Sequence, residues 1–198
     1  MKVIYLDHAA CTKPVAAAID AFRTAPFGNP SSEHAVGQAA RDALEQAREK
    51  IAKKKAYVQR IREKITSCSK YHVYPETTIR LKGKPPTFID YLIDADLFTV
   101  GVEVKSSVND LYSGYGRNFV CDLNYLICPP DAIAAAARLL DRMNRRDVGI
   151  IVFGRGRTTI VRSAEWMYKA PYGKFNNQIA FFLGVDKEFE SNLCNALL

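Results

Sequence analysis

The sequence contains no apolar run that approaches the roughly 20 residues that a membrane-spanning helix requires. Its first residues, 1–7, also lack the apolar stretch of a secretory signal. We therefore expect a cytoplasmic protein with no membrane partner. The chain has no internal repeat and no low-complexity tract. Because 48% of its 198 residues are hydrophobic and 25% are charged, disordered, collagen-like and purely coiled-coil proteins are excluded as well.

Cysteine is present in an odd number, and the five thiols are scattered along the chain without a C-x-x-C pair. This pattern predicts reduced, mostly buried thiols.

Positive charge is concentrated in one stretch of the chain. The net charge is +7, and residues 41–70 hold many more lysines and arginines than acidic side chains. Apolar positions recur close to a 3.6-residue period from Val36 to Ile65, which predicts one long basic helix, with Ser31 or Ser32 as its N-cap. Its basic face either neutralises phosphates or is simply solvated.

The remaining elements are predicted from β-type runs and turn signals after Tyr71. Three adjacent strands are expected, then a polar segment with glycines at 108–119, a fourth strand, a helix capped by Asp131, two further strands and a C-terminal helix. Their expected ranges are 77–81, 88–93, 98–104, 124–128, 132–143, 148–153, 158–161 and 176–183.

Asp90, Glu103 and Lys105 form the most informative constellation in the sequence. Successive side chains of a strand alternate between its two faces, so Glu103 and Lys105 point the same way. Asp90 lies on the preceding strand, and a return along the neighbouring strand would bring the two carboxylates together beside the ammonium. The alternative is a surface salt bridge between Glu103 and Lys105.

Two carboxylates beside an ammonium suit the hydrolysis of a phosphodiester. Mg²⁺ or Mn²⁺ prefers oxygen ligands, neutralises charge on a phosphate and acidifies a bound water. The ammonium of Lys105 would position that water or stabilise the developing negative charge.

The element order α-β-β-β-α-β and the string Asp90…Glu103-x-Lys105 resemble the PD-(D/E)XK nuclease superfamily over about residues 56–153. The resemblance implies an α/β, restriction-endonuclease-like core with a mixed central sheet, preceded by a helical N-terminal arm. It implies that Asp90 and Glu103 bind Mg²⁺ or Mn²⁺, that Lys105 is catalytic and that Glu63 on the preceding helix is an auxiliary acid.

The polar segment after Lys105 begins beside the predicted metal. In this superfamily the helix that follows the E-x-K motif often contributes groups to the site and to the phosphate backbone. By that resemblance the candidates for substrate contacts are Ser106, Asp110, Tyr115, Arg117 and Asn118. The alternative is a solvated loop that carries glycines.

The N-terminal part of the chain has a different resemblance. Residues 5–12, YLDHAACT, and residues 27–34, FGNPSSEH, resemble the opening of a cysteine desulfurase of the pyridoxal-phosphate aminotransferase type. The family's Schiff-base lysine follows a histidine, and this sequence contains no His-Lys dipeptide. We expect no pyridoxal phosphate, and interpret residues 1–54 as a truncated arm with a structural or oligomerising role.

These patterns predict three segments: the desulfurase-like arm at 1–54, a nuclease-like domain at 55–165, and an aromatic and helical extension at 166–198 that packs on the core. The leading hypothesis is a metal-dependent DNA endonuclease, with a possible homo-oligomer through the arm. The alternatives are a catalytically silent module that binds nucleic acid or protein, and an accessory protein related to cysteine desulfurase. Trp166, Tyr168 and Tyr172 either stack on unpaired bases or pack in the core.

Overall fold

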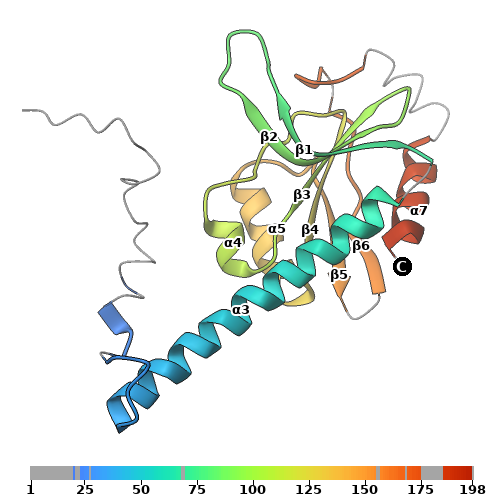
Figure 1. Cartoon of the computed structure of the whole chain (residues 1–198). Coiled ribbons are helices and arrows are strands. Elements are labelled where there is room, and N and C mark those ends of the chain that lie inside the picture. The colour runs from blue at the N-terminus through green and yellow to red at the C-terminus, as the bar shows by residue number, and fades with distance from the viewer. Residues whose placement is uncertain are drawn as a thin grey trace, which may run out of the picture. The chain divides into compact units, whose positions relative to one another are not determined.

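The fold is that of a computed structural model, which describes residues 20, 23–26, 28–67, 70–154, 157–167, 169–174 and 185–197 (Figure 1). The chain divides into two compact units, Met1–Lys53 and Lys54–Leu198. The boundary falls within helix α3 (Ala35–Thr66), which is the long basic helix expected from the sequence.

Helix α3 begins after the two serines that the sequence offers as N-caps. The Ser31 N–H binds Asn29 Oδ1 at 3.0 Å, and the Ser32 N–H binds the Asn29 carbonyl at 3.0 Å. The Gly37 N–H instead donates to His34 Nδ1 at 3.2 Å. The predicted N-cap is therefore wrong, because Asn29 closes a turn around both serines and His34 caps the helix.

The turn before α3 folds back tightly on the first turns of this helix. A Cβ on Gly37 would stand 2.6 Å from the Ser32 carbonyl oxygen, and one on Gly28 would stand 2.7 Å from the Val36 carbonyl oxygen. Neither position has room for a side chain. The Arg41 guanidinium holds the same turn by donating to the Pro30 carbonyl at 2.8 Å.

The second unit is built on a six-stranded mixed sheet in the order β1-β2-β3-β4-β5-β6. The pairs β1/β2, β2/β3 and β5/β6 are antiparallel, and β3/β4 and β4/β5 are parallel. The strands are β1 (His72–Ile79), β2 (Thr87–Asp94), β3 (Thr99–Val104), β4 (Leu123–Cys128), β5 (Gly149–Gly154) and β6 (Arg157–Arg162). The predicted mixed α/β fold is confirmed at this level.

Strand β1 begins earlier than the sequence predicts. It runs from His72 through Pro75 and Glu76, and Glu76 has a positive φ of 48°. The register joins Pro75 to Tyr91 and Thr77 to Ile89, so it omits Glu76. A proline and a left-handed residue resemble a turn in the sequence, but β1 lies at the edge of the sheet and tolerates both.

Helices cover both faces of the sheet (Figure 1). Ile61 and Ile65 of α3, together with Phe189 and Leu193 of α7 (Val185–Leu197), pack into the core on one face. On the other face, α4 (Val108–Tyr112) and α5 (Ile133–Arg142) close a second core. All residues of β3 and β4 are buried, as expected for inner strands covered on both sides.

Two further helix predictions differ from the fold. Asp131 does not cap α5: it lies within the short 3₁₀ turn η1 (Pro130–Ala132), and Ala132, which precedes α5, makes no side-chain cap bond. The predicted helix at 176–183 lies outside the described residues. Helix α7 follows that range and lies within the predicted helical extension at 166–198.

Cys121 and Cys128 are buried free thiols, as predicted, and burial raises the pKa of each to about 12. In the part of the chain that the structure describes, no helix is both long and apolar enough to cross a membrane.

Candidate functional site

Asp90 and Glu103 meet on one face of the β2/β3 pair. The antiparallel register joins Tyr91 to Val102 and Leu92 to Gly101, and its continuation sets Asp90 opposite Glu103. Asp90 Oδ2 accepts a hydrogen bond of 2.7 Å from the Val104 N–H. The β2/β3 pairing therefore brings together the two carboxylates that the sequence predicts to be neighbours.

Glu103 is a buried acid without a well-formed hydrogen bond. The residue is 1% exposed, and within the described part of the chain neither carboxylate oxygen makes a hydrogen bond of good geometry. The Asp90 carboxyl and the Asn118 N–H nevertheless lie near enough to influence its pKa. Burial and the negative charge of Asp90 raise the pKa of Glu103 to about 8, against the opposing charge of Lys105 and a smaller effect of the Asn118 N–H. Burial also raises the pKa of Asp90, although the Val104 N–H and Lys105 counteract it.

Lys105 lies at the end of β3 with its side chain on the same face. Its backbone N–H donates to the Ile127 carbonyl at 2.8 Å, which continues the pairing of β3 with β4. The residue is 4% exposed. Its Nζ donates to the Tyr115 carbonyl at 2.7 Å and lies 4.0 Å from Asp110 Oδ1. The ammonium is thus held by backbone and carboxylate oxygens beneath the segment that follows it.

Gly116 lies close to the side chains of both Lys105 and Glu103. It has a φ of 57°, and a Cβ built on it would stand 2.5 Å from Lys105 Nζ and 2.6 Å from Glu103 Oε2. The backbone of residues 114–116 can therefore approach the two side chains only because position 116 carries no side chain. Gly114 also has a positive φ, of 89°, but nothing lies within 4 Å of its added Cβ.

The residues predicted to contact substrate have three kinds of environment. Asp110 Oδ2 accepts from the Ser106 N–H at 2.9 Å and the Ser106 hydroxyl at 3.0 Å, so this pair orders the chain next to Lys105. Arg117 donates to the Leu111 carbonyl at 2.7 Å, and Asn118 donates to the Phe88 carbonyl at 2.7 Å. Tyr115 presents an exposed side chain while its carbonyl binds Lys105.

Glu63 is not brought to this site. It lies exposed on α3, where its carboxylate accepts a hydrogen bond of 2.9 Å from Gln59. Within the described part of the chain, no group of three or more histidine, cysteine, aspartate or glutamate side chains could hold a metal ion. The acidic site consists of a pair, Asp90 and Glu103.

This pair fits a hard divalent cation chemically. Glu103 offers two buried oxygens that make no well-formed hydrogen bond among the described residues, and Asp90 offers the oxygen that Val104 does not occupy. A cation such as Mg²⁺ is commonly held by one or two carboxylates and completes its shell with water and substrate phosphate. A bound cation would also favour the ionised form of Glu103, which burial disfavours.

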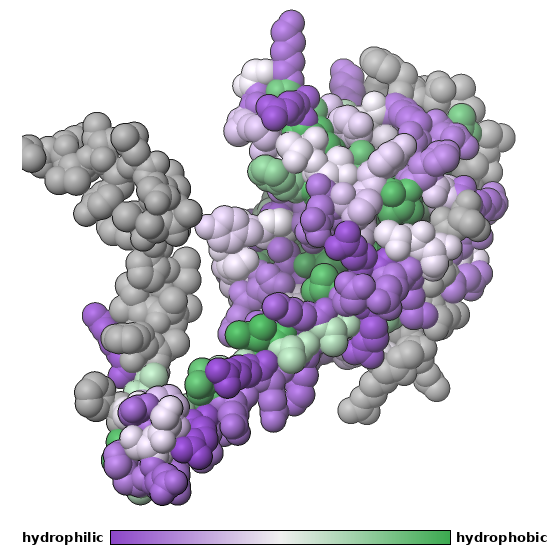
Figure 2. Space-filling view, in the orientation of Figure 1, coloured by the Kyte–Doolittle hydropathy of each residue, from purple (hydrophilic) through white to green (hydrophobic). Residues whose placement is uncertain are grey.

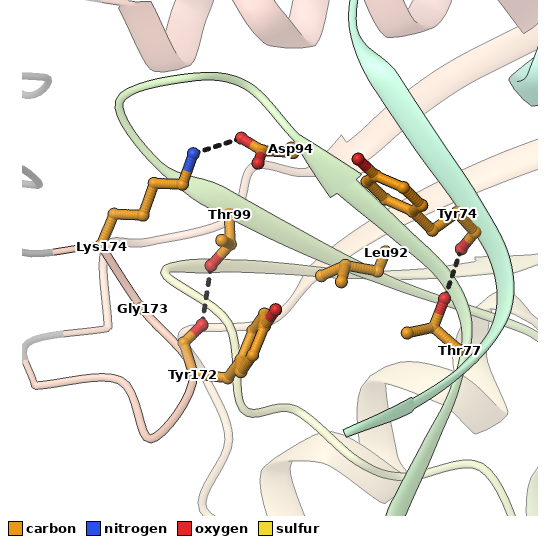
Figure 3. Close-up of a pocket in the computed structure, with 8 residues that line it drawn as sticks. All are labelled: Tyr74, Thr77, Leu92, Asp94, Thr99, Tyr172, Gly173 and Lys174. Carbon is orange, nitrogen blue, oxygen red and sulfur yellow. Dashed lines mark hydrogen bonds and ion pairs between the residues drawn. The ribbon is translucent and has the colours of Figure 1, made fainter. Parts of the chain in front are cut away.

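The aromatic residues near the C-terminus have different environments. Trp166 packs edge-on against Phe98, with ring centroids 5.2 Å apart, and so belongs to the core. Tyr172 lines a cavity of about 500 Å³ on the sheet (Figure 3). Tyr168 lies outside the described residues. The sequence did not predict this cavity, because its lining residues are far apart along the chain.

Comparison with known proteins supports one of the two resemblances over a short segment. No protein-family model matches the chain. A segment is 53% identical over 53 residues to cysteine desulfurase IscS of Dictyoglomus turgidum, covering 25% of this chain. The match spans only 14% of that protein's length. The SPO1766 protein of unknown function from Silicibacter pomeroyi aligns over 61% of this chain and 82% of its own, with 19% identity and a TM-score of 0.34.

Proposed function

We propose that the second unit is a metal-dependent nuclease that hydrolyses DNA phosphodiester bonds. The observation that carries this proposal is the placement of buried Glu103, whose oxygens make no well-formed hydrogen bond among the described residues, beside Asp90 and Lys105. A buried acid is costly to a fold, and acids with strongly raised pKa values cluster at functional sites.

The order of elements supports a restriction-endonuclease-like core within residues 55–165. Helix α3 precedes three antiparallel strands, β1, β2 and β3, and α4 then leads to β4, which is parallel to β3. In such a core the two acids lie on the second and third strands, as Asp90 and Glu103 do here.

Asp90 and Glu103 would hold Mg²⁺ or Mn²⁺, with Glu103 in its ionised form. When bound, the cation would neutralise charge on the scissile phosphate and lower the pKa of a water molecule. Lys105 would orient the attacking water or donate to the phosphate oxygen that gains charge. Asp110, 4.0 Å from the ammonium, keeps Lys105 directed towards this face.

The segment that follows Lys105 covers the site, so it would have to move when a substrate binds. Lys105 now donates to the Tyr115 carbonyl, and a phosphate oxygen would take the place of that carbonyl. Residues Ser106, Arg117 and Asn118 lie at the partly exposed margin of this segment, where contacts to a DNA backbone would form.

Cleavage of supercoiled and single-stranded DNA with Mg²⁺ or Mn²⁺ tests the proposal. Glu103→Gln and Lys105→Met should each lower the cleavage rate by about a hundredfold or more. Glu63→Gln is the matched control, because it removes an acid that lies away from the site, and it should retain wild-type cleavage. Metal-dependent cleavage that survives Glu103→Gln would contradict the assignment, and no cleavage of any substrate by the wild type would favour a silent binding module.

The first unit has a separate feature that favours association. Val36, Leu44 and Ile51 are 54%, 40% and 54% exposed on α3, and apolar side chains are interspersed among hydrophilic ones along this helix (Figure 2). Leu44 and Ile51 are seven residues apart, so they lie on one stripe of the helix. We infer that this stripe contacts a second copy of the chain, and sedimentation of a Leu44→Lys variant should show a loss of association.

A further inference from the structure

A second concave site lies on the same face of the sheet as Asp90 and Glu103. It is a cavity of about 500 Å³ between strands β1 to β3 and residues 172–174 (Figure 3). Leu92 and Asp94 alternate with Asp90 along β2, and Tyr74 is paired with Leu92, so all of them share one face. The lining residues are Tyr74, Thr77, Leu92, Asp94, Thr99, Tyr172, Gly173 and Lys174.

Residues 172–174 form one wall of this cavity, and hydrogen bonds hold them against the sheet. The Thr99 hydroxyl donates to the Tyr172 carbonyl at 2.7 Å. The Lys174 N–H donates to Asp122 Oδ2 at 2.9 Å, and the Thr99 N–H binds the same oxygen at 2.9 Å. Asp122 is 1% exposed, so this link lies inside the protein. The wall that residues 172–174 form is therefore fixed to the sheet by hydrogen bonds to the buried residues Thr99 and Asp122.

The lining combines flat apolar surface with polar ends. Tyr74 and Tyr172 are 50% and 39% exposed, and in the view of Figure 3 Leu92 lies between their side chains. At one end, Lys174 pairs with Asp94 and also donates to the Asp96 carbonyl at 2.8 Å. Aromatic rings that offer open faces, next to hydrogen-bonding groups, suit a flat heteroaromatic ligand.

The cavity lies along β3 from the acidic pair. Thr99 lines the cavity and Glu103 belongs to the pair, and both point to the same face of this strand. Four residues of a strand span roughly 13 Å. A strand of nucleic acid that places a phosphate at Asp90 and Glu103 could therefore place a neighbouring base in the cavity.

We propose that this cavity binds an unpaired nucleobase of the DNA strand that the acidic pair cleaves. This proposal rests on the proposed nuclease function and adds that the substrate presents an unstacked base to Tyr74 and Tyr172. Lys174 and Asp94 would contact the polar edge of that base. Base stacking on aromatic side chains tolerates every base, so this contact selects unpaired strand and does not read sequence.

Binding measured in EDTA separates this inference from cleavage. The probe is a single-stranded DNA oligonucleotide with one 2-aminopurine, whose fluorescence falls when the base stacks, and the full-length protein is used. The double variant Tyr74→Ala/Tyr172→Ala should bind this probe roughly tenfold more weakly or worse, whereas Tyr74→Phe/Tyr172→Phe should restore binding because the rings remain. Tyr112→Ala is the matched control, since it removes an exposed tyrosine that does not line the cavity.

Two further probes identify the source of the base. An oligonucleotide of the same length with an abasic position should bind more weakly to the wild type, and deoxyadenosine monophosphate alone should bind only weakly. Equal affinity for the intact and abasic strands, or an equal loss in Tyr112→Ala, would overturn the inference even if the protein cleaves DNA. Tight binding of the free nucleotide would also overturn it, by assigning the cavity to a small molecule. Loss of probe binding in the double alanine variant of a protein that cleaves nothing would support the cavity and refute the nuclease.

Discussion

Gly116 lies against Lys105 so closely that a Cβ on the glycine would stand 2.5 Å from the lysine Nζ. The same Cβ would stand 2.6 Å from Glu103 Oε2. One backbone position therefore touches both the ammonium and the carboxylate of the candidate site, and the size of residue 116 controls their arrangement.

Gly116→Ala and Gly114→Ala form a matched pair that tests this contact. Both glycines have positive φ, 57° and 89°, and alanine is strained at each. Backbone strain alone would make Gly114→Ala the worse change, because 57° is nearer the left-handed region that alanine can enter. We expect the reverse, with Gly116→Ala lowering the free energy of unfolding by about 1–3 kcal/mol and impairing cleavage. Denaturant titration of both variants measures the free energy of unfolding. A larger loss of stability in Gly114→Ala than in Gly116→Ala would show that Lys105 and Glu103 move away from the added methyl group without cost.

The stability of the metal-free protein should fall as the pH rises. The pKa of Glu103 is raised from 4.5 to about 8 in the folded protein, so the folded state holds its proton more tightly than the unfolded chain. The resulting stabilisation is fully present below about pH 4.5 and is lost as the pH rises through about 8. Between pH 5 and pH 9 the loss should be on the order of a few kcal/mol.

Chemical denaturation in EDTA at these two pH values measures this loss. Glu103→Gln keeps the shape of the side chain and removes its proton equilibrium, so its stability should vary much less with pH. A Glu103→Gln variant that loses as much stability as the wild type would show that another group titrates.

Mn²⁺ binding should depend on the acidic pair and not on Glu63. Calorimetric titration of the wild type with Mn²⁺ should give a binding curve that Asp90→Asn and Glu103→Gln each weaken by tenfold or more, since each removes a charged oxygen ligand. Glu63→Gln should bind Mn²⁺ as the wild type does, because Glu63 bonds to Gln59 on the exposed side of α3. Equal weakening by Glu63→Gln would mean that this acid reaches the site after all.

Two isoleucines of α3 should respond differently to truncation. Ile65 is 0% exposed within the core of the second unit, whereas Ile51 is 54% exposed in the first. Ile65→Ala should lower the free energy of unfolding by about 2–5 kcal/mol. Ile51→Ala should change it by less than about 0.5 kcal/mol, and should weaken self-association in sedimentation experiments. Comparable destabilisation by both changes would mean that Ile51 is covered within the monomer.

The central strands and the acidic pair could be predicted because they depend on local rules. Runs of apolar residues defined β3 and β4 to within a residue or two, and alternation along a strand put Glu103 and Lys105 on one face. The return of β3 beside β2 then followed from a short connection. Strand β1 was predicted too short because Pro75 and Glu76 carry turn-like signals that an edge position overrides.

Features that depend on distant segments could not be predicted. Helix α7 places Phe189 and Leu193 in the core, and their partners there, such as Phe98 and Tyr125, lie far away in the sequence. The cavity needs Tyr172 and Lys174 to return beside Thr99 and Asp94, and that return is decided by the buried carboxylate of Asp122. The backbone near Gly116 covers Lys105, and this close approach depends on the positive φ of Gly116 and on its lack of a side chain.

The parallel pairing of β3 and β4 requires a long connection, and in this protein that connection covers part of the acidic pair. Parallel neighbours require a crossover that carries the chain back along the sheet, commonly through a dozen or more residues. Here that crossover is residues 105–122, the same stretch that holds Lys105, α4 and Gly116. Deletions within residues 105–122 would therefore alter the cover of the acids and the connection that pairs β3 with β4 at the same time.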